Sequence, residues 1–331
     1  MKNLLSALAL STALVAGAAF ADEVKPAVVF DMGGKFDRSF NEGIYNGSKK
    51  WSEESGVKIA EFEVTNESQR EQALRRMAEN GANVVIAVGF AQAPALEIVA
   101  DEFPDVKFAI IDAVVEKPNV QSIVFKEQEG SFLVGVLAAL ASKTGTVGFV
   151  GGMDIPLIRA FGCGYVQGVH YANSSAKVLE NMTGTTPAAW NDPTKGGELA
   201  RSQFDRGADV VYAAAGATGL GVLQAAADAK KLSIGVDSNQ NHLHPGSVLT
   251  SMLKRVDVAA YNVFKSAQDG KFKPGVNVLG LKEDGVGWAL DDNNAKLVTP
   301  EMKTKVDAAA KGIIDGSIQV VDYRTNNSCP M

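Results

Sequence analysis

Cysteine and histidine are scarce in this chain, with 2 and 3 residues among 331. Cys163 and Cys329 are far apart, and His242 and His244 flank one leucine with no cysteine or glutamate beside them. Neither pattern has the spacing of a zinc site. The G-x-S-x-G motif of serine hydrolases is also absent, as is any Ser/His/Asp order that suggests hydrolysis. We therefore expect no metal site and no catalytic residues of this kind.

Positive charge is not in excess either. The chain has 32 Lys+Arg against 38 Asp+Glu, which gives a formal net charge of −6, and it contains no basic patch. This balance argues against nucleic acid or an anionic membrane as a partner. Beyond the N-terminus no stretch is apolar enough to span a bilayer. Length and composition indicate one large or two medium globular domains, and we expect a monomer.

The N-terminus has the pattern of a cleavable signal peptide over residues 1–21. Lys2 supplies the positive charge, Leu4–Phe20 is apolar and rich in small residues, and Ala19-Phe20-Ala21 fits the cleavage rule. No cysteine follows the cleavage point, so we expect a periplasmic protein without a membrane anchor. In that oxidising compartment Cys163 and Cys329 can form a disulfide, and two free thiols remain the alternative.

Apolar strands alternate with amphipathic helices along the rest of the chain. Gly81–Gly89 (GANVVIAVG) and Gly207–Gly216 (GADVVYAAAG) are two copies of one strand pattern, and each is followed by a helix and a strand ending in aspartate. Capping boxes at Ser39/Glu42 and Ser68/Glu71 predict two helix starts. Alternation of this kind predicts an α/β fold of two similar Rossmann-like lobes, each with a parallel sheet.

Three of the predicted strands end in aspartate, at Asp31, Asp112 and Asp237. Ligands of open parallel sheets bind at the carboxyl ends of the strands. Phe40 and Asn41 open the helix that follows Asp31, so an aromatic face and an amide reach the same edge. Carboxylates without a metal suit hydrogen bonds to hydroxyl or N–H groups, as at a ribose. The alternative is that Asp31 is a turn residue and Phe40 a core residue.

One segment imitates a dinucleotide-binding fingerprint. Gly216–Gly221 (GATGLG) follows a strand and has Asp237 beyond it, but its spacing is G-x-x-G-x-G rather than G-x-G-x-x-G. No hydride-transfer group accompanies it, so an NAD enzyme is disfavoured and no cofactor is expected.

Four motifs resemble the basic membrane protein family, the substrate-binding proteins of ABC importers, several of which bind purine nucleosides. They occur in the family's order over nearly the whole mature chain: D-x-S-F-N within Gly33–Gly47, GGMDIP at 151–156, WNDPTKG at 190–196 and GVDS at 235–238. The resemblance implies a type I periplasmic-binding fold whose lobes are joined by three hinge crossovers. We expect these near Phe125–Gln128, Val236–Asn241 and Asn277–Val286, with residues 22–126 plus 240–277 in the N-terminal lobe and 127–239 plus 278–331 in the C-terminal lobe.

The same resemblance assigns site residues. It implies base stacking by Phe40, with Asn41 beside it, and by Trp190, where the family usually has phenylalanine. It implies sugar- or base-binding carboxylates at Asp31, Asp112 and Asp237, a backbone contact at Gly216 and the family's basic site residue at Lys254. The expected function is binding of a nucleoside, with a purine base favoured, and its delivery to an ABC permease. A nucleosidase, or a binding protein for another small polar ligand such as a sugar, is the alternative.

Overall fold

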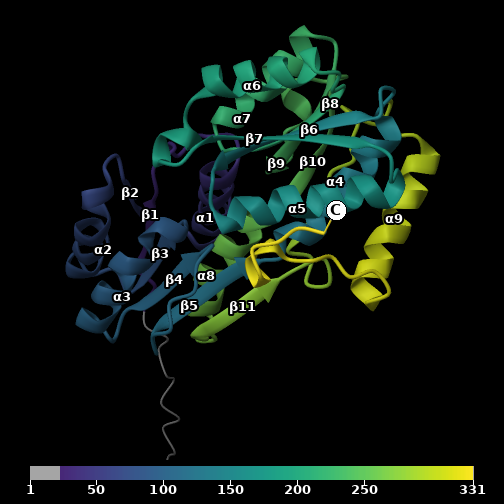
Figure 1. Cartoon of the computed structure of the whole chain (residues 1–331). Coiled ribbons are helices and arrows are strands. Elements are labelled where there is room, and N and C mark those ends of the chain that lie inside the picture. The colour runs from purple at the N-terminus through teal and green to yellow at the C-terminus, as the bar shows by residue number, and fades with distance from the viewer. Residues whose placement is uncertain (1–22, 331) are drawn as a thin grey trace, which may run out of the picture.

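The computed structural model describes residues 23–330, so the predicted signal peptide lies outside the described residues. The chain builds two six-stranded sheets that lie in separate lobes (Figure 1). The first sheet has the order β11-β5-β4-β3-β1-β2, and its paired strands all run parallel. The strands and helices of this lobe are β1 (Pro26–Phe30), α1 (Phe40–Ser55), β2 (Ala60–Glu63), α2 (Arg70–Glu79), β3 (Val84–Val88), α3 (Ala93–Glu102), β4 (Lys107–Ile111), β5 (Val120–Phe125), α8 (Val256–Gln268) and β11 (Gly275–Leu279).

The second sheet repeats this order as β12-β10-β9-β8-β6-β7, except that its last strand, β12, runs antiparallel to β10. This lobe contains α4 (Glu127–Ala141), β6 (Thr146–Met153), α5 (Pro156–Ala172), β7 (Lys177–Gly184), α6 (Pro193–Asp205), β8 (Val210–Ala214), α7 (Thr218–Asp228), β9 (Leu232–Asp237), β10 (Val248–Lys254), β12 (Val286–Trp288) and α9 (Pro300–Asp315). The matching strand orders confirm the two-lobed α/β fold and the internal duplication expected from the sequence.

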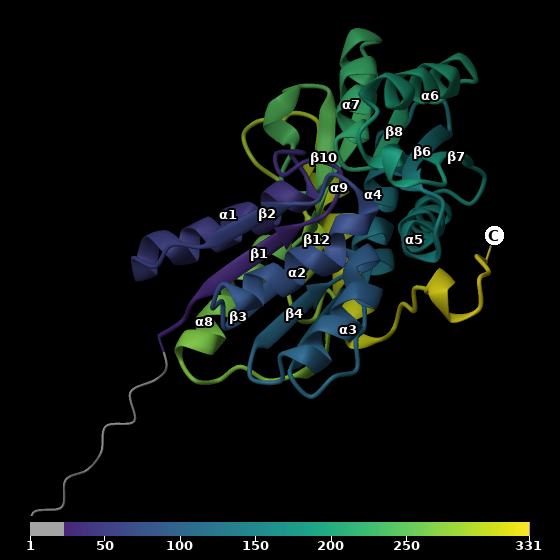
Figure 2. The same cartoon turned by 90° about the vertical axis from the view of Figure 1, so that its left-hand side faces the viewer.

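Helices cover both faces of each sheet, which is why the central strands are apolar without alternation. Val28 and Phe30 of β1 pack in the core shared with α1 and α8, and Ala27 and Val29 pack in the core beneath α2 and α3. In the second lobe α6 and α7 cover one face of the sheet, and α4 and α5 cover the other (Figures 1 and 2). Helices α4 and α5 approach each other so closely that a Cβ at Gly168 would lie 2.0 Å from the Phe132 carbonyl oxygen.

The chain passes between the lobes three times, as expected, but the second crossover lies later than predicted. Strand β10 pairs in parallel with β9, so residues 248–254 belong to the second sheet rather than to the first lobe. The chain returns to the first lobe between Lys254 and Val256, where α8 begins, and not at Val236–Asn241. The predicted position of the second crossover is wrong because β10 follows β9 after a short turn and adds to the same sheet. The first crossover lies between β5 and α4 and the third between β11 and β12, both within the expected ranges.

Both predicted capping boxes are wrong in detail. Helix α1 begins after Ser39, but the Ser39 hydroxyl makes no cap bond, and the carboxylate of Asp37 accepts the first amides instead. The turn before α2 is capped by Asn66 together with Gln69, rather than by Ser68 and Glu71. In each case a carboxylate or amide two residues earlier in the chain takes the exposed helix N–H groups.

The C-terminal tail returns from α9 to lie on α5. Cys329 forms a disulfide with Cys163 of α5, and the Cα atoms of the pair are 5.5 Å apart. The side chain of Gln167 also binds the backbone of Val321, accepting from its N–H at 2.9 Å and donating to its carbonyl at 3.0 Å. Both cysteines lie in the second lobe, and of the two alternatives for them the structure has the disulfide.

Candidate functional site

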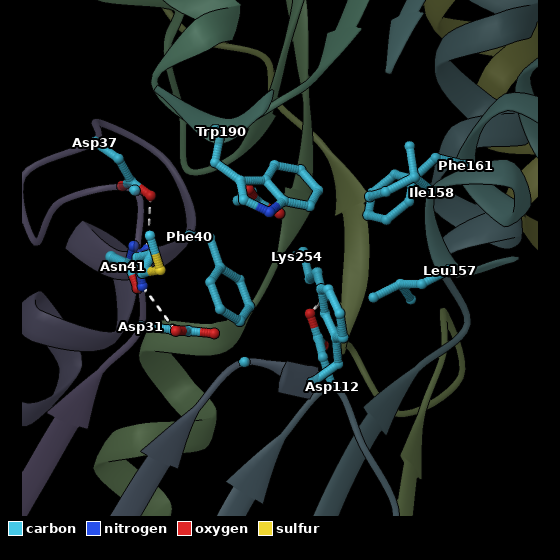
Figure 3. Close-up of a pocket in the computed structure, with 16 residues that line it drawn as sticks. Asp31, Asp37, Phe40, Asn41, Asp112, Leu157, Ile158, Phe161, Trp190 and Lys254 are labelled. Atoms are coloured by element: carbon cyan, nitrogen blue, oxygen red, sulfur yellow. Dashed lines mark hydrogen bonds and ion pairs between the residues drawn. The ribbon is translucent and has the colours of Figure 1, made fainter. Parts of the chain in front are cut away.

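A cavity between the lobes is lined by all eight residues that the sequence assigned to a site (Figure 3). It encloses about 620 Å³ of empty space, part of which opens to solvent. The carboxyl ends of β1, β3 and β4 face the carboxyl ends of β8, β9 and β10 across it. The eight predicted residues are Asp31, Phe40, Asn41, Asp112, Trp190, Gly216, Asp237 and Lys254.

Asp31 lies directly after β1 and is held in place by the first lobe. Its Oδ1 accepts from Arg70 Nε at 3.0 Å and from the Met32 N–H at 2.8 Å. Burial raises the pKa of Asp31, while the Met32 amide and the Arg70 guanidinium oppose that shift. A Cβ at Gly89 would approach the Asp31 side chain to 3.5 Å, and the φ of Gly89 is +92°, which favours glycine there.

The N-terminus of α1 brings Asp37, Phe40 and Asn41 to the cavity. The buried carboxylate of Asp37 accepts from the N–H groups of Ser39, Asn41 and Glu42 at 2.8, 3.0 and 3.1 Å. Burial nevertheless raises the pKa of Asp37 to about 6. Asn41 donates to the Gly34 carbonyl at 3.2 Å, and its buried Oδ1 has no partner among the described residues. That oxygen is free to accept a hydrogen bond from a ligand.

Trp190 comes from the second lobe, in the turn between β7 and α6. Its ring lies so close to Gly152 that a Cβ there would be 2.1 Å from Cζ3, which explains the second glycine of the GGMDIP motif. A Cβ at Gly33 of the first lobe would lie 3.5 Å from the Trp190 Cβ. Trp190 therefore packs close to the first lobe as well as the second. Figure 3 shows the Trp190 and Phe40 rings facing the same space from opposite lobes.

Lys254, the last residue of β10, is buried in a cluster of carboxylates. Its Nζ lies 2.7 Å from Asp112 Oδ2 and 3.1 Å from Glu127 Oε1, and its side chain is 2% exposed. The ring of Phe40 also lies beneath this ammonium, 5.2 Å from Nζ. Burial alone would lower the pKa of Lys254, but the surrounding carboxylates raise it well above its ordinary value. The lysine therefore stays charged and fixes Asp112 in position.

Asp112 and Asp237 occupy equivalent places in the two lobes, and both have a left-handed backbone. Their φ angles are +75° and +62°, a conformation that is uncommon for any residue other than glycine. Asp237 accepts from the Ser39 hydroxyl of the opposite lobe, and burial raises its pKa to about 6. Asp112 Oδ1 is buried without a hydrogen-bond partner in the described part of the chain. Strained, incompletely paired carboxylates of this kind are typical of binding sites.

Sequence reasoning missed several residues around the cavity. Asp37 is the first residue of the D-x-S-F-N core, so the signal for it was present. Leu157, Ile158 and Phe161 of α5 form an apolar wall, but their spacing is that of any amphipathic helix, and nothing in it indicates a ligand. Glu127 touches the site only through Lys254, and no local pattern could have indicated that contact.

The lining of the cavity suits a flat, partly polar molecule. Within residues 23–330 no group of three or more His, Cys, Asp or Glu residues is arranged to hold a metal ion. The lining combines aromatic rings with acceptors at their edges, which suits stacking of a planar group and hydrogen bonding of hydroxyl or N–H donors.

Among residues 23–330, no helix has both the length and the apolar character needed to cross a bilayer.

Comparison with known proteins gives consistent matches over nearly the whole described chain. Residues 24–322 match the family model described as Bmp, ABC transporter substrate-binding protein PnrA-like. An ABC transporter nucleoside-binding protein, BmpA, of Lactococcus lactis is 33% identical over 324 residues, covering 90% of this chain and 89% of that protein. An uncharacterized lipoprotein of Pyrococcus horikoshii is 38% identical over 285 residues, covering 81% of this chain and 69% of that protein.

Solved structures agree with these matches. The crystal structure of an ABC transporter solute-binding protein from Aeropyrum pernix superposes with a TM-score of 0.84 at 30% identity. The match covers 92% of this chain and 95% of that one.

Proposed function

Because this chain belongs to the Bmp family of PnrA-like ABC transporter substrate-binding proteins, we propose that it binds a purine nucleoside in the cavity between its lobes. The bound nucleoside is then delivered to an ABC permease. A relative from Lactococcus lactis is named a nucleoside-binding protein, which supports the ligand class. The eight site residues predicted from the sequence carry this binding.

The main support for a nucleoside is the pair of aromatic rings on opposite lobes. Phe40 opens α1 of the first lobe, and Trp190 precedes α6 of the second, and both line the cavity. A purine is flat and apolar on its faces, so it fits between two such rings. The rings approach each other only when the lobes are closed, which links ligand binding to hinge motion.

The acceptors around the rings fit the edge of a nucleoside. Asp112 Oδ1 and Asn41 Oδ1 are both buried and have no hydrogen-bond partner among the described residues. Ribose hydroxyls and purine N–H groups are donors, so each can pair with one of these oxygens. Hydrogen bonds to ionised acceptors are stronger than those between neutral groups, and Asp31 and Asp237 add two further carboxylates.

Calorimetric titration with guanosine, adenosine, inosine, cytidine and ribose tests this function. We expect purine nucleosides to bind more tightly than cytidine and far more tightly than ribose alone. Mass spectrometry of the small molecules that copurify with the protein identifies the natural ligand. Tight binding of ribose by itself, with no preference for a base, would instead indicate a sugar-binding protein.

We expect no turnover of the bound ligand. Carboxylates around a nucleoside can also serve a nucleosidase, which would release a free base. Incubating the protein with a binding nucleoside and analysing the products by chromatography separates the two functions. A binding protein leaves the nucleoside unchanged. An amount of free base that increases with time and with protein concentration would contradict transport as the only role.

The protein is also proposed to act in the periplasm after cleavage behind Ala21. Residues 1–21 have the signal-peptide pattern. The Pyrococcus horikoshii relative is named a lipoprotein, whereas this chain has no cysteine at the cleavage point. N-terminal sequencing of the exported protein should begin at Asp22. Retention of Met1 in a membrane fraction would contradict the cleavage.

A further inference from the structure

A chain of ion pairs links the C-terminal tail to the cavity. It begins at Arg324, in the short turn Tyr323–Thr325, whose guanidinium Nη1 lies 2.9 Å from Glu127 Oε2. Glu127 Oε1 lies 3.1 Å from Lys254 Nζ, and Lys254 Nζ lies 2.7 Å from Asp112 Oδ2. The series therefore runs from a residue whose side chain is 28% exposed to a carboxyl group that lines the cavity.

Glu127 is the critical member, because it is fully buried at the first crossover. Its side chain is 0% exposed, and apart from the two ion pairs neither carboxylate oxygen has a hydrogen-bond partner among the described residues. Burial raises the pKa of Glu127, and Lys254 and Arg324 oppose that shift, while Asp112 adds to it. Removing one cation from such a group leaves an uncompensated buried charge.

Arg324 is held in a fixed geometry by its own turn. Its Nε donates to Asp322 Oδ1 at 2.9 Å, and its Nη2 donates to the Phe125 carbonyl at 3.0 Å. Phe125 ends β5 in the first lobe, whereas the tail lies on the second lobe. The guanidinium thus touches both sides of the first crossover.

The tail that carries Arg324 has few other attachments. After α9 it forms no further α-helix or strand up to residue 330, and its fixed points on α5 are the Gln167–Val321 pair and the Cys163–Cys329 disulfide. Chain ends without such ties tend to open locally. The disulfide therefore keeps Arg324 near Glu127.

We propose that Arg324 is a positioning residue for the ligand site and that the Cys163–Cys329 disulfide makes its action sensitive to reduction. With Arg324 present, Glu127 lies between two cations, and Lys254 is free to hold Asp112. Without Arg324, Glu127 competes for Lys254, and Asp112 loses its fixed partner. Reduction by an added dithiol has the same result: two electrons and two protons break the S–S bond to two thiols, and the dithiol becomes its own disulfide.

The test compares Arg324→Gln with Arg75→Gln as the matched control. Arg75 forms exposed ion pairs on α2 and α3, at 2.7 Å from Glu71 and Glu102, away from the cavity. This inference rests on the proposed function for its ligand, so purine-nucleoside affinity is measured by calorimetry. We expect a loss of about tenfold in Arg324→Gln, within the usual range for coupled sites, and no change in Arg75→Gln.

Two readouts separate positioning from general damage. Relative to the wild type, the loss in Arg324→Gln should shrink as the pH falls, because burial raises the pKa of Glu127 and its protonated form no longer competes for Lys254. The double variant Arg324→Gln/Glu127→Gln should recover most of the affinity, since it removes the uncompensated charge. A loss that neither low pH nor the second substitution relieves would overturn the proposal.

Reduction and a ligand-free measurement complete the experiment. Dithiol treatment of the wild type should lower affinity as Arg324→Gln does, and Cys163→Ser/Cys329→Ser should show the loss without responding to dithiol. In the ligand-free protein, amide hydrogen exchange at residues 125–129 should rise in Arg324→Gln. If no nucleoside binds even the wild type, the proposed function fails, and this exchange result decides the inference. Unchanged exchange overturns it whatever the ligand.

Discussion

Lys254 shows how one residue can organise a site that contains many carboxylates. Asp112, Glu127 and Asp237 all raise its pKa, so it remains a cation although it is almost fully buried. The ammonium in turn offsets the repulsion between these carboxylates, because it lies among them. A neutral side chain at position 254 would leave at least one buried charge without a partner, a costly arrangement.

The aromatic pair gives the first residue-level prediction. Phe40→Ala and Trp190→Ala should each weaken nucleoside binding by roughly 1–3 kcal/mol, the range measured for base–aromatic stacking. Phe36→Ala is the matched control, since this ring lies on the loop that precedes α1 but is 61% exposed and does not line the cavity. Calorimetry on the three variants checks the prediction. Equal affinities for all three would mean that the two rings are core residues.

The second residue-level prediction concerns the pH dependence of stability through Asp237. Its pKa is raised to about 6 by burial, with Asp37 and Glu127 adding to the shift and Lys254 and Ser39 opposing it. A carboxyl whose folded pKa exceeds its unfolded pKa stabilises the fold below about pH 4 and loses that contribution as the pH rises through about 6.

The ligand-free wild type should therefore lose about 2 kcal/mol in free energy of unfolding between pH 4 and 6 relative to Asp237→Asn. Urea denaturation at several pH values measures both proteins. Parallel profiles would contradict the assignment of this pKa shift to Asp237.

How far the sequence predicts the site depends on whether a residue is part of a local motif. Asp31, Asp112 and Asp237 follow apolar strands, and that pattern alone places them at a sheet edge. Phe40 and Asn41 belong to a short motif beside one of them. Glu127 and Arg324 cannot be identified this way, because the former is a buried acid at the start of an apolar helix and the latter lies in a tail. Their roles arise only from tertiary contacts.

Among the elements, α1 depends on a cap that the sequence did not identify. Ser39 has the residue type and spacing of an N-cap, yet its hydroxyl binds Asp237 across the cleft. Asp37 can replace it because one carboxylate reaches three amides at once. The tertiary contact of Ser39 therefore outweighs the local preference from which the capping box was predicted.

Asp37→Ala should accordingly lower the free energy of unfolding by about 1–2 kcal/mol, as expected for loss of a helix cap. Glu42→Ala should cost about 0.5 kcal/mol or less, because Glu42 accepts only from the Arg38 backbone and its guanidinium. Urea denaturation at pH 7 compares the two. A larger effect for Glu42 would favour the Ser39/Glu42 capping box after all.

For the whole molecule, the lobe boundary is the feature that the sequence located least well. The alternation of strands and helices was enough to predict two similar lobes, and the family resemblance implied the three crossovers. It could not distinguish a strand that continues the second sheet from one that starts the return to the first, because both are short apolar runs after a turn. Only the pairing of β10 with β9 decides this, and it is a contact between segments.

Lobe closure gives the prediction at this scale. The contacts from Ser39 to Asp237 and from Gln240 to the Arg38 carbonyl, the latter at 2.9 Å, join the lobes beside the cavity. We expect the radius of gyration from small-angle X-ray scattering to fall when a purine nucleoside is added, and the scattering mass to be that of a monomer. Trp190→Ala should need more ligand for the same change. A radius that is unchanged at saturation would contradict closure by hinge motion.

The three crossovers also affect the order in which the protein can be built during synthesis. The first sheet is completed by β11, which follows residue 274, and the second by β12, which follows residue 285. A ribosome has therefore made more than four-fifths of the chain before either sheet has its full set of strands. Contacts between segments so distant in sequence form slowly. A chain truncated before residue 275 therefore leaves both sheets without an edge strand.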